Sequence, residues 1–335
     1  MDALYNAAKP RVVAIGGPTA TGKTALSVAL AKRFGGEIIS ADSMQIYQGL
    51  DVGTAKVTPE EMQGVPHHLV GFLAPEQAFS VADFTTLAGK TITQLTAQGK
   101  LPLVVGGTGL YITSLLNGIG FTPEKVDPAI RQELQARLQA EGSQALYAEL
   151  AAVDPGYAAK VHPNNTPRVI RALELYRATG RKMSAEREAA RPEEKPYRSL
   201  CLCLTCRDRT LLYQRIDTRC DRMMQSGILE EAKLVYDHRD TYRTAAQAIG
   251  YKEFFPYFEG TADLESCLAH LKQASRNYAK RQLTWFRRQT GRCGSAIYLG
   301  KHEETWGTAG GTNKTEAACR WRKTIALKCS NNIAI

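Results

Sequence analysis

Residues 17–24 read Gly-Pro-Thr-Ala-Thr-Gly-Lys-Thr and form a phosphate-binding motif. They match the pattern GxxxxGK[ST] in full and follow a short apolar run at residues 12–15. In such a loop glycines let backbone N–H groups converge on an anion, Lys23 adds a positive charge, and the Thr24 hydroxyl can reach a magnesium ion. The motif does not identify the phosphate compound. We predict that the whole loop binds it: Gly17, Pro18, Thr19, Ala20, Thr21, Gly22, Lys23 and Thr24.

Asp42 is the second residue with the chemistry of a reactive group. It follows the run Glu37-Ile-Ile-Ser40, which we predict to be a strand parallel to the first. Ligands of parallel sheets bind at the carboxyl ends of the strands, so Asp42 lies near the phosphate loop. A carboxylate there can accept a proton from an attacking nucleophile, or it can only cap the following turn. Ser43 and Gln45 add hydrogen-bonding groups, and a glutamine amide can pair with adenine.

The strand predicted at residues 101–105 ends in glycines and Thr108, without an acidic residue. A P-loop ATPase that hydrolyses ATP usually places an acidic side chain there to help hold magnesium. The sequence therefore argues against a motor or switch protein. A small-molecule kinase and a transferase that binds a diphosphate both stay open.

Further signals place these residues on an α/β fold. A helix is predicted at residues 23–34 with a Gly35-Gly36 cap, and Ser80 with Asp83 forms a capping box for a helix ending near residue 98. A strand returns at residues 200–205, and helices follow at 211–236 and about 264–289. Strands that alternate with helices predict a P-loop, doubly wound parallel sheet.

The region between residues 121 and 196 has helical periodicity and no convincing strand. We predict a discontinuous P-loop transferase core at residues 8–120 and 198–300, interrupted by an all-helical insertion at 121–197. Residues 301–335 are poor in apolar periodicity and are predicted to be a weakly ordered tail.

Composition indicates an ordinary globular protein. The 335 residues are 44% hydrophobic, which suffices for a large core, and neither a signal peptide nor a membrane-spanning run is present. We expect a cytoplasmic monomer with reduced thiols. Cys201, Cys203 and Cys206 alternate with leucines, which favours a buried strand over a metal site. The adjacent His67 and His68 point to opposite sides of an extended chain, which disfavours a shared metal.

The formal net charge of +10 raises the odds of a polyanionic partner. Six basic residues and no acidic one lie between residues 276 and 292. On a helix, Arg276, Lys280 and Arg287 share a stripe beside an apolar stripe made of Ala279, Leu283 and Phe286. Such a stripe fits a solvated amphipathic helix and a contact with nucleic-acid phosphates equally well.

Several further runs occur in the order found in one enzyme family. The chain resembles the tRNA dimethylallyltransferases over about residues 11–290. Besides the phosphate loop, the resemblance rests on these runs: Ile39-Ser-Ala-Asp-Ser-Met-Gln-Ile-Tyr47, Gly53-Thr-Ala-Lys56, Val65-Pro-His-His68, Ser80-Val-Ala-Asp-Phe84, Val105-Gly-Gly-Thr-Gly-Leu-Tyr111, His162-Pro-Asn-Asn-Thr-Pro-Arg-Val-Ile-Arg-Ala-Leu-Glu174, Ile249-Gly-Tyr251 and Lys280-Arg-Gln-Leu-Thr-Trp285.

The resemblance implies a reaction and roles for residues. It implies transfer of a dimethylallyl group from dimethylallyl diphosphate to N6 of the adenosine just 3′ of the tRNA anticodon (tRNA position 37), with Mg²⁺ as cofactor and the anticodon stem-loop as partner. By the same resemblance, the loop and Lys23 hold the diphosphate, Asp42 is the general base, Thr24 lies near magnesium, and Arg219 assists the diphosphate. Implied tRNA contacts are Asp42, Ser43, Met44, Gln45, Thr108, Arg131, Thr166, Pro167, Arg168, Val169, Ile170, Arg276, Lys280, Arg281 and Arg287.

One departure and three alternatives accompany this interpretation. Many relatives have Asp-Pro-Gln-Arg where this chain has Asn165-Thr-Pro-Arg168, so a contact made by that glutamine is not carried over. A P-loop small-molecule kinase explains the loop and Asp42, but not the insertion or the basic helix. A prenyltransferase for free adenine nucleotides needs no basic insertion. A non-catalytic RNA-binding protein does not explain the intact Lys23, Thr24 and Asp42.

Overall fold

The computed structural model describes residues 9–121, 127–190, 192–206 and 208–299, and only the backbone for residues 289–299. The chain forms two compact units. The core unit comprises Met1–Leu116 and Pro196–Ile335, and the helical unit comprises Asn117–Lys195. The tail predicted at residues 301–335 lies outside the described residues.

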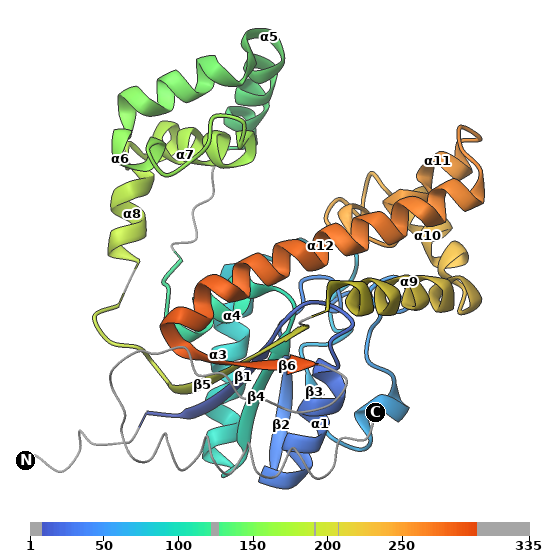
Figure 1. Cartoon of the computed structure of the whole chain (residues 1–335). Coiled ribbons are helices and arrows are strands. Elements are labelled where there is room, and N and C mark those ends of the chain that lie inside the picture. The colour runs from blue at the N-terminus through green and yellow to red at the C-terminus, as the bar shows by residue number, and fades with distance from the viewer. Residues whose placement is uncertain (1–8, 122–126, 191, 207, 300–335) are drawn as a thin grey trace, which may run out of the picture. The chain divides into compact units, whose positions relative to one another are not determined.

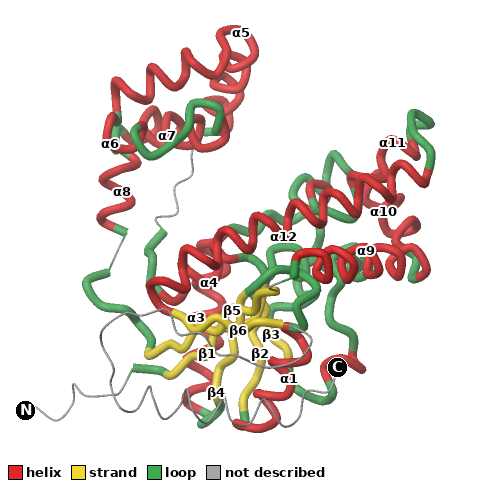
Figure 2. The backbone as a smooth tube through the Cα atoms, in the orientation of Figure 1, coloured by secondary structure: helices red, strands yellow, loops and turns green. Residues whose placement is uncertain are grey.

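The core unit is built on a six-stranded parallel sheet with the strand order β3-β2-β4-β1-β5-β6 (Figures 1 and 2). The predicted α/β class with a parallel sheet is confirmed. The two outermost strands, β3 and β6, were not among the predicted ones. The strands are β1 (Arg11–Gly16), β2 (Gly36–Ser40), β3 (His67–His68), β4 (Leu101–Gly106), β5 (Arg198–Cys206) and β6 (Gly294–Leu299).

Alternating side chains of the strands fill two hydrophobic clusters, one on each face of the sheet. On β5, Leu202 and Leu204 pack with α1 (Lys23–Phe34), whereas Cys201 and Cys203 face α3 (Val81–Ala97), α4 (Gly109–Leu116) and α12 (Leu264–Cys293). Both sheet faces are therefore covered, which is the usual arrangement for parallel strands. The prediction that the alternating leucines and cysteines form a buried strand is confirmed.

The helix boundaries follow the signals in the sequence. Helix α1 ends at Gly35, which has the left-handed φ of 61°. Helix α3 begins with the predicted capping box: the Ser80 side chain accepts from the Asp83 N–H, and the Asp83 carboxylate accepts from the Ser80 N–H. The helical structure predicted over residues 211–236 is confirmed and consists of two helices. Gly227, with φ 91°, separates α9 (Arg209–Gln225) from α10 (Ile228–Asp237).

A further cluster joins the chain that follows β2 to the C-terminal helices of the core unit. Tyr47 and Tyr251 are fully buried in it, and α12 packs along α9 (Figure 1). This cluster fixes α12 against the rest of the core. The remaining elements of the core unit are α2 (Pro59–Met62), α11 (Phe255–Phe258) and two 3₁₀ helices, Ala245–Gln247 and Lys252–Phe254.

The helical unit consists of α5 (Pro128–Val153), α6 (Pro155–Ala158), α7 (Thr166–Thr179) and α8 (Met183–Ala189). Helix α5 bends at Gly142, whose φ of 80° is not helical. The buried Asp154 ties the unit together: one carboxylate oxygen accepts from the Tyr157 N–H at 3.0 Å and the other from the Ser184 N–H at 2.8 Å. Leucines of α5 and apolar residues of α7 form its core.

Candidate active site

The phosphate loop joins β1 to α1 and has an unusual backbone. Three of its residues have positive φ: Gly17 at 147°, Ala20 at 62° and Gly22 at 79°. The loop closes on itself, because the buried Thr21 hydroxyl and the Lys23 ammonium each donate to the Pro18 carbonyl at 2.7 Å. Helix α1 starts at Lys23 without a side-chain cap, so first-turn N–H groups are left for an anion.

Two cations meet at this loop without a full set of counter-charges. Arg219 of α9 donates from Nη1 to the Thr19 hydroxyl at 2.7 Å, across 200 residues of sequence. Burial and, to a lesser extent, the charge of Arg219 lower the pKa of Lys23 to about 8, although Asp42 partly offsets both effects. Burial also lowers the pKa of Arg219, again against the effect of Asp42. The site thus holds excess positive charge, which an anion would stabilise.

Asp42 lies at the end of β2, close enough to Lys23 and Arg219 to influence both pKa values. Its Oδ1 atom accepts hydrogen bonds from the backbone N–H groups of Met44, at 2.9 Å, and Gln45, at 3.4 Å. The described residues place no hydrogen-bond donor on its Oδ2 atom. Capping and proton acceptance are therefore compatible, since one oxygen holds the turn and the other stays available.

Thr108 connects the ends of β2 and β4. Its hydroxyl accepts from the Ser43 N–H at 3.1 Å, and its own N–H donates to the Ala41 carbonyl at 3.2 Å. Gln45 has a structural role that the sequence did not reveal, because its amide donates to the Thr54 and Ala55 carbonyls at 3.3 and 3.0 Å. These bonds fix the loop that carries Asp42.

Helix α12 brings three further residues to the site, and sequence reasoning missed their roles. The Gln282 amide accepts from the Thr19 N–H and donates to the Gly107 carbonyl, both at 3.0 Å. Burial and the charge of Asp42 raise the pKa of Tyr278 to about 12, although hydrogen bonding to Thr108 and Gln282 lowers it in part. Trp285 donates to the Thr113 hydroxyl at 3.2 Å. Gln282 and Trp285 lie in a motif already noted, but only tertiary contacts show what they do.

The glycines after β4 let these elements approach closely. A Cβ atom on Gly106 would lie 2.1 Å from the Ala41 carbonyl oxygen. At Gly107 it would lie 2.2 Å from Gln282 Nε2, and at Gly109 2.2 Å from the Trp285 ring. Real Cβ atoms do not show such distances. Gly106 therefore lets β4 approach the Ala41 backbone, Gly109 leaves room for the Trp285 ring, and a larger residue at Gly107 would displace the Gln282 amide.

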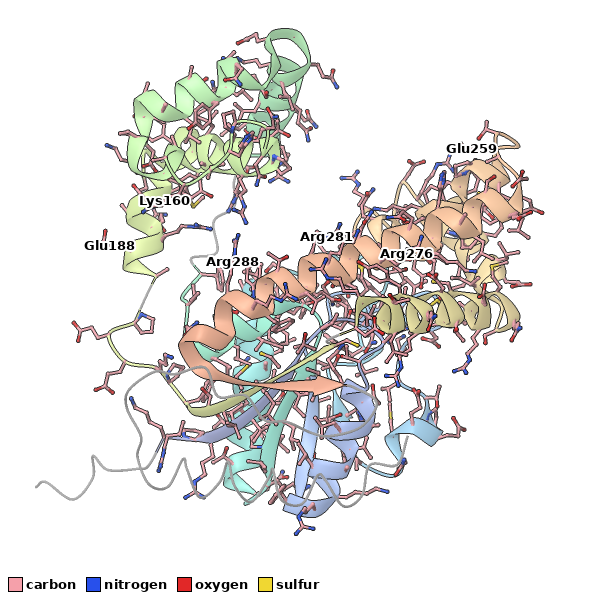
Figure 3. All side chains as sticks on the ribbon, in the orientation of Figure 1. Lys160, Glu188, Glu259, Arg276, Arg281 and Arg288 are labelled. Atoms are coloured by element: carbon pink, nitrogen blue, oxygen red, sulfur yellow. The ribbon has the colours of Figure 1, made fainter. Side chains whose placement is uncertain are left out.

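The other face of α12 is basic. Ala279, Leu283 and Phe286 are buried, which confirms the predicted apolar stripe. The predicted basic residues have different surroundings: Arg276 donates to Asp217 at 2.6 Å, Lys280 lies over the Tyr213 ring, and Arg281 lies over the Tyr278 ring. Arg287 is exposed on the same helix. Figure 3 shows Arg276, Arg281 and Arg288 spaced along α12.

The tRNA contacts expected in the helical unit fall into two groups. Arg131 is half exposed and donates from Nε and Nη2 to the buried carboxylate of Glu174, which also accepts from Arg171. Thr166, Pro167 and Arg168 form the first turn of α7, where Arg168 and Pro167 are exposed. Val169 and Ile170 are buried in the unit's core, so their side chains have a packing role.

The phosphate loop is the place where magnesium would fit. Among the described residues, no three His, Cys, Asp or Glu side chains gather as a metal site. Mg²⁺ often takes few protein ligands and completes its shell with substrate phosphates and water. The Thr24 hydroxyl beside a bound diphosphate is compatible with such a site. The two histidines have separate partners, His67 with the Val65 carbonyl and His68 with Glu37.

Comparisons with known proteins agree on one family. The model of the IPP transferase family matches residues 45–289, and that of the isopentenyl transferases matches residues 10–70. A tRNA dimethylallyltransferase of Bacillus subtilis is 51% identical over 282 residues, which are 84% of this chain and 89% of the relative. One from Geobacillus thermodenitrificans is 49% identical over 279 residues, covering 83% and 88%.

Solved structures agree as well. The crystal structure of a tRNA isopentenylpyrophosphate transferase from Bacillus halodurans has a TM-score of 0.65 and 42% identity, and the match covers 96% of this chain and 97% of the other. A eukaryotic dimethylallyltransferase acting on tRNA gives a TM-score of 0.73 at 31% identity, covering 86% and 74%. Within the described residues, no helix has the length and apolar character needed to cross a membrane.

Proposed function

The chain belongs to the IPP transferase family, which includes the tRNA dimethylallyltransferases, and we propose that it modifies tRNA in the same way. It transfers a dimethylallyl group from dimethylallyl diphosphate to N6 of the adenosine just 3′ of the anticodon and releases diphosphate. The observation that carries the proposal is the pairing of two poorly compensated cations, Lys23 and Arg219, with the available oxygen of Asp42.

The donor side of the site suits a leaving diphosphate. As the allylic carbon–oxygen bond breaks, negative charge grows on the diphosphate oxygens. The loop N–H groups, Lys23 and Arg219 are already in place to stabilise that charge, and preorganised donors of this kind supply a large part of catalysis. Mg²⁺, held by Thr24 and the diphosphate, would neutralise part of the same charge.

The acceptor side requires a proton acceptor. The exocyclic amine of adenine is a weak nucleophile, because its lone pair is delocalised into the ring. When N6 bonds to the allylic carbon, it carries a surplus proton, and we assign that proton to Oδ2 of Asp42. The bonds from Met44 and Gln45 to Oδ1 hold the carboxylate in one orientation for this transfer. The products are the N6-dimethylallyl adenosine and diphosphate.

The acceptor is proposed to be a tRNA anticodon stem-loop because exposed basic groups occur on both units. The basic face of α12 and the half-exposed Arg131 are suited to phosphate contacts that position RNA without reading its sequence. Taking an adenine out of its stack costs a few kcal/mol, which phosphate contacts and site contacts must offset. A free nucleotide offers too few phosphates to engage these surfaces.

The test offers labelled dimethylallyl diphosphate with unmodified tRNA, with AMP, or with no acceptor. We expect label on tRNA alone, on the adenosine that follows the anticodon. Label on AMP alone would establish the free-nucleotide alternative, and absence of label on any tRNA would refute the proposal. A parallel reaction with labelled ATP and a panel of small-molecule acceptors tests the kinase alternative, for which we expect no phosphate transfer.

A further inference from the structure

Gln282 is a buried glutamine that no part of the proposed chemistry uses. Its side chain is only 5% exposed, and it projects from α12 between the phosphate loop and the end of β4. Both halves of its amide are bonded: Oε1 accepts from the Thr19 N–H and Nε2 donates to the Gly107 carbonyl, each at 3.0 Å. A buried amide with donor and acceptor both satisfied by backbone groups fixes the distance between those groups.

The two backbone segments that this amide joins both lie at the site. Thr19 precedes Ala20, a non-glycine residue with a φ of 62°, which is a costly conformation that surrounding contacts must maintain. The Gln282 amide packs closely against Gly107, since a Cβ atom at that position would lie 2.2 Å from Gln282 Nε2. The hydroxyl of Thr19 in turn accepts from Arg219 Nη1 at 2.7 Å. A continuous chain therefore runs from Gly107 through Gln282 and Thr19 to the Arg219 guanidinium.

We propose that Gln282 is a positioning residue for the donor diphosphate: its amide holds the Thr19 end of the phosphate loop and, through Thr19, orients Arg219. This inference rests on the proposed function of the loop as a diphosphate site. Gln282 touches neither the reacting carbon nor the adenine, so it acts through Thr19 and Arg219. The two bonds require one donor and one acceptor in a planar amide, which explains why glutamine and not glutamate or methionine occupies this place.

The test compares Gln282→Met, which keeps the volume and removes both bonds, with Gln282→Glu, which keeps the acceptor for Thr19 but points a carboxylate at the Gly107 carbonyl. Binding of inorganic diphosphate and of unmodified tRNA is measured by calorimetry. We expect Gln282→Met to raise the Kd for diphosphate about tenfold and to leave the Kd for tRNA within twofold of the wild type. Gln282→Glu should weaken diphosphate binding further, because it adds negative charge to an anion site.

Two controls separate positioning from general destabilisation. Gln225→Met changes an exposed glutamine at the end of α9 and should leave both Kd values unchanged. Gly107→Ala displaces the Gln282 amide from the other side, and its φ lies outside the left-handed region, so it should reproduce the diphosphate defect. In the Gly107→Ala, Gln282→Met double variant the two defects should not add, since both break the same chain of bonds.

The outcomes are distinguishable. Unchanged diphosphate binding in Gln282→Met, or an equal loss for diphosphate and tRNA with a lowered melting temperature, would overturn the positioning role. Additive defects in the double variant would also contradict it. Failure of the wild type to prenylate tRNA would instead refute the proposed function, because the binding measurements do not depend on turnover.

Discussion

Arginine occurs in both the donor site and the helical unit, but its hydrogen-bond partners differ between the two regions. In the donor site Arg219 donates to an uncharged hydroxyl, and burial lowers its pKa. In the helical unit Arg177 donates to Glu149 and Glu133, and these bonds raise its pKa. Arg137 behaves in the same way toward Glu141 and Glu149. An arginine paired with a carboxylate stabilises the fold of its unit. An arginine that donates to an uncharged group can instead stabilise a bound anion.

The donor site and the helical unit also differ in how they are built. The donor site is assembled from β1, β2, β4, α9 and α12, which are joined by hydrogen bonds between residues 65 to 263 positions apart. The helical unit pairs charges within and between its helices, at separations of 3 to 44 residues. Buried hydrogen bonds between residues far apart in the sequence hold the atoms of the site in one geometry, which catalysis requires. Exposed pairs contribute little each and suit a surface that meets a charged polymer.

The largest effect should follow from Asp42→Asn, because it removes the proton acceptor and keeps the turn. The asparagine Oδ1 still accepts from the Met44 N–H, so the fold is retained. We expect turnover to fall about a thousandfold. Loss of an acidic charge that offsets both Lys23 and Arg219 should leave diphosphate affinity unchanged or higher. Weaker diphosphate binding with retained turnover would contradict both roles; single-turnover kinetics and calorimetry measure them.

Arg219→Gln and Arg177→Gln test the two kinds of arginine directly. Arg219→Gln should lower turnover about a hundredfold and leave the free energy of unfolding unchanged or higher, since an unmatched buried charge is removed. Arg177→Gln should leave turnover within twofold and lower stability by about 1 kcal/mol. Prenylation rates and urea unfolding give the two readouts. A loss of stability without loss of turnover in Arg219→Gln, or a loss of turnover in Arg177→Gln, would contradict this distinction between the two arginines.

The basic face of α12 belongs to the core unit but, unlike the donor site, is exposed. Its variants therefore test whether exposure or location decides how a basic residue contacts an anion. Joint replacement of Arg276, Lys280 and Arg287 by glutamine should weaken tRNA binding about tenfold and reduce the salt slope of log K by about 2. Arg276 should contribute least, because Asp217 already pairs with it. Donor affinity should not change. Binding titrations at several salt concentrations measure the slope, and an unchanged slope would leave this face without an RNA role.

A smaller effect is expected for Arg131→Gln in the helical unit, with Arg137→Gln as its match. Each change breaks the pairing of an α5 arginine with a glutamate. Only Arg131 is a proposed phosphate contact, and its side chain is 52% exposed. We expect the Kd for tRNA to rise about fivefold in Arg131→Gln and to stay constant in Arg137→Gln. Equal losses would mean that both variants act only through folding of the unit.

The smallest expected effect is the uptake of protons when diphosphate binds. Because the pKa of Lys23 is lowered to about 8, the free site holds a partly charged lysine at pH 8, and a bound diphosphate raises that pKa again. Binding should therefore take up about half a proton at pH 8 and almost none at pH 6, where Lys23 is already charged. Calorimetry in buffers of different ionisation enthalpy measures this uptake. Lys23→Arg, which does not titrate in this range, should abolish its pH dependence.

Local signals made much of the core predictable. The glycine cap of α1, the capping box of α3 and the apolar runs of β1, β2, β4 and β5 each depend on a few adjacent residues. The outer strand β3 escaped prediction because it is only two residues long, and β6 because its pairing with β5 is set by the fold. Helical structure over residues 211–236 is predicted from the sequence, but the break at Gly227 shows only in its positive φ.

The site was less predictable than the fold. The loop and Asp42 were found from motif and strand order, but the sequence posed capping and proton acceptance as alternatives for Asp42, and its two oxygens separate the tasks. Gln282 gave no signal of its own, since its partner Thr19 lies 263 residues away. Residues that act through distant backbone groups cannot be found from spacing along the chain.

The glycines after β4 have a consequence for how this protein tolerates mutation. One added methyl group at Gly106, Gly107 or Gly109 collides with Ala41, Gln282 or Trp285. A saturation survey of variants should therefore find these three positions as intolerant as the residues that handle substrate. Such a survey would rank them beside Asp42, and only the contact distances reveal that their constraint is lack of room.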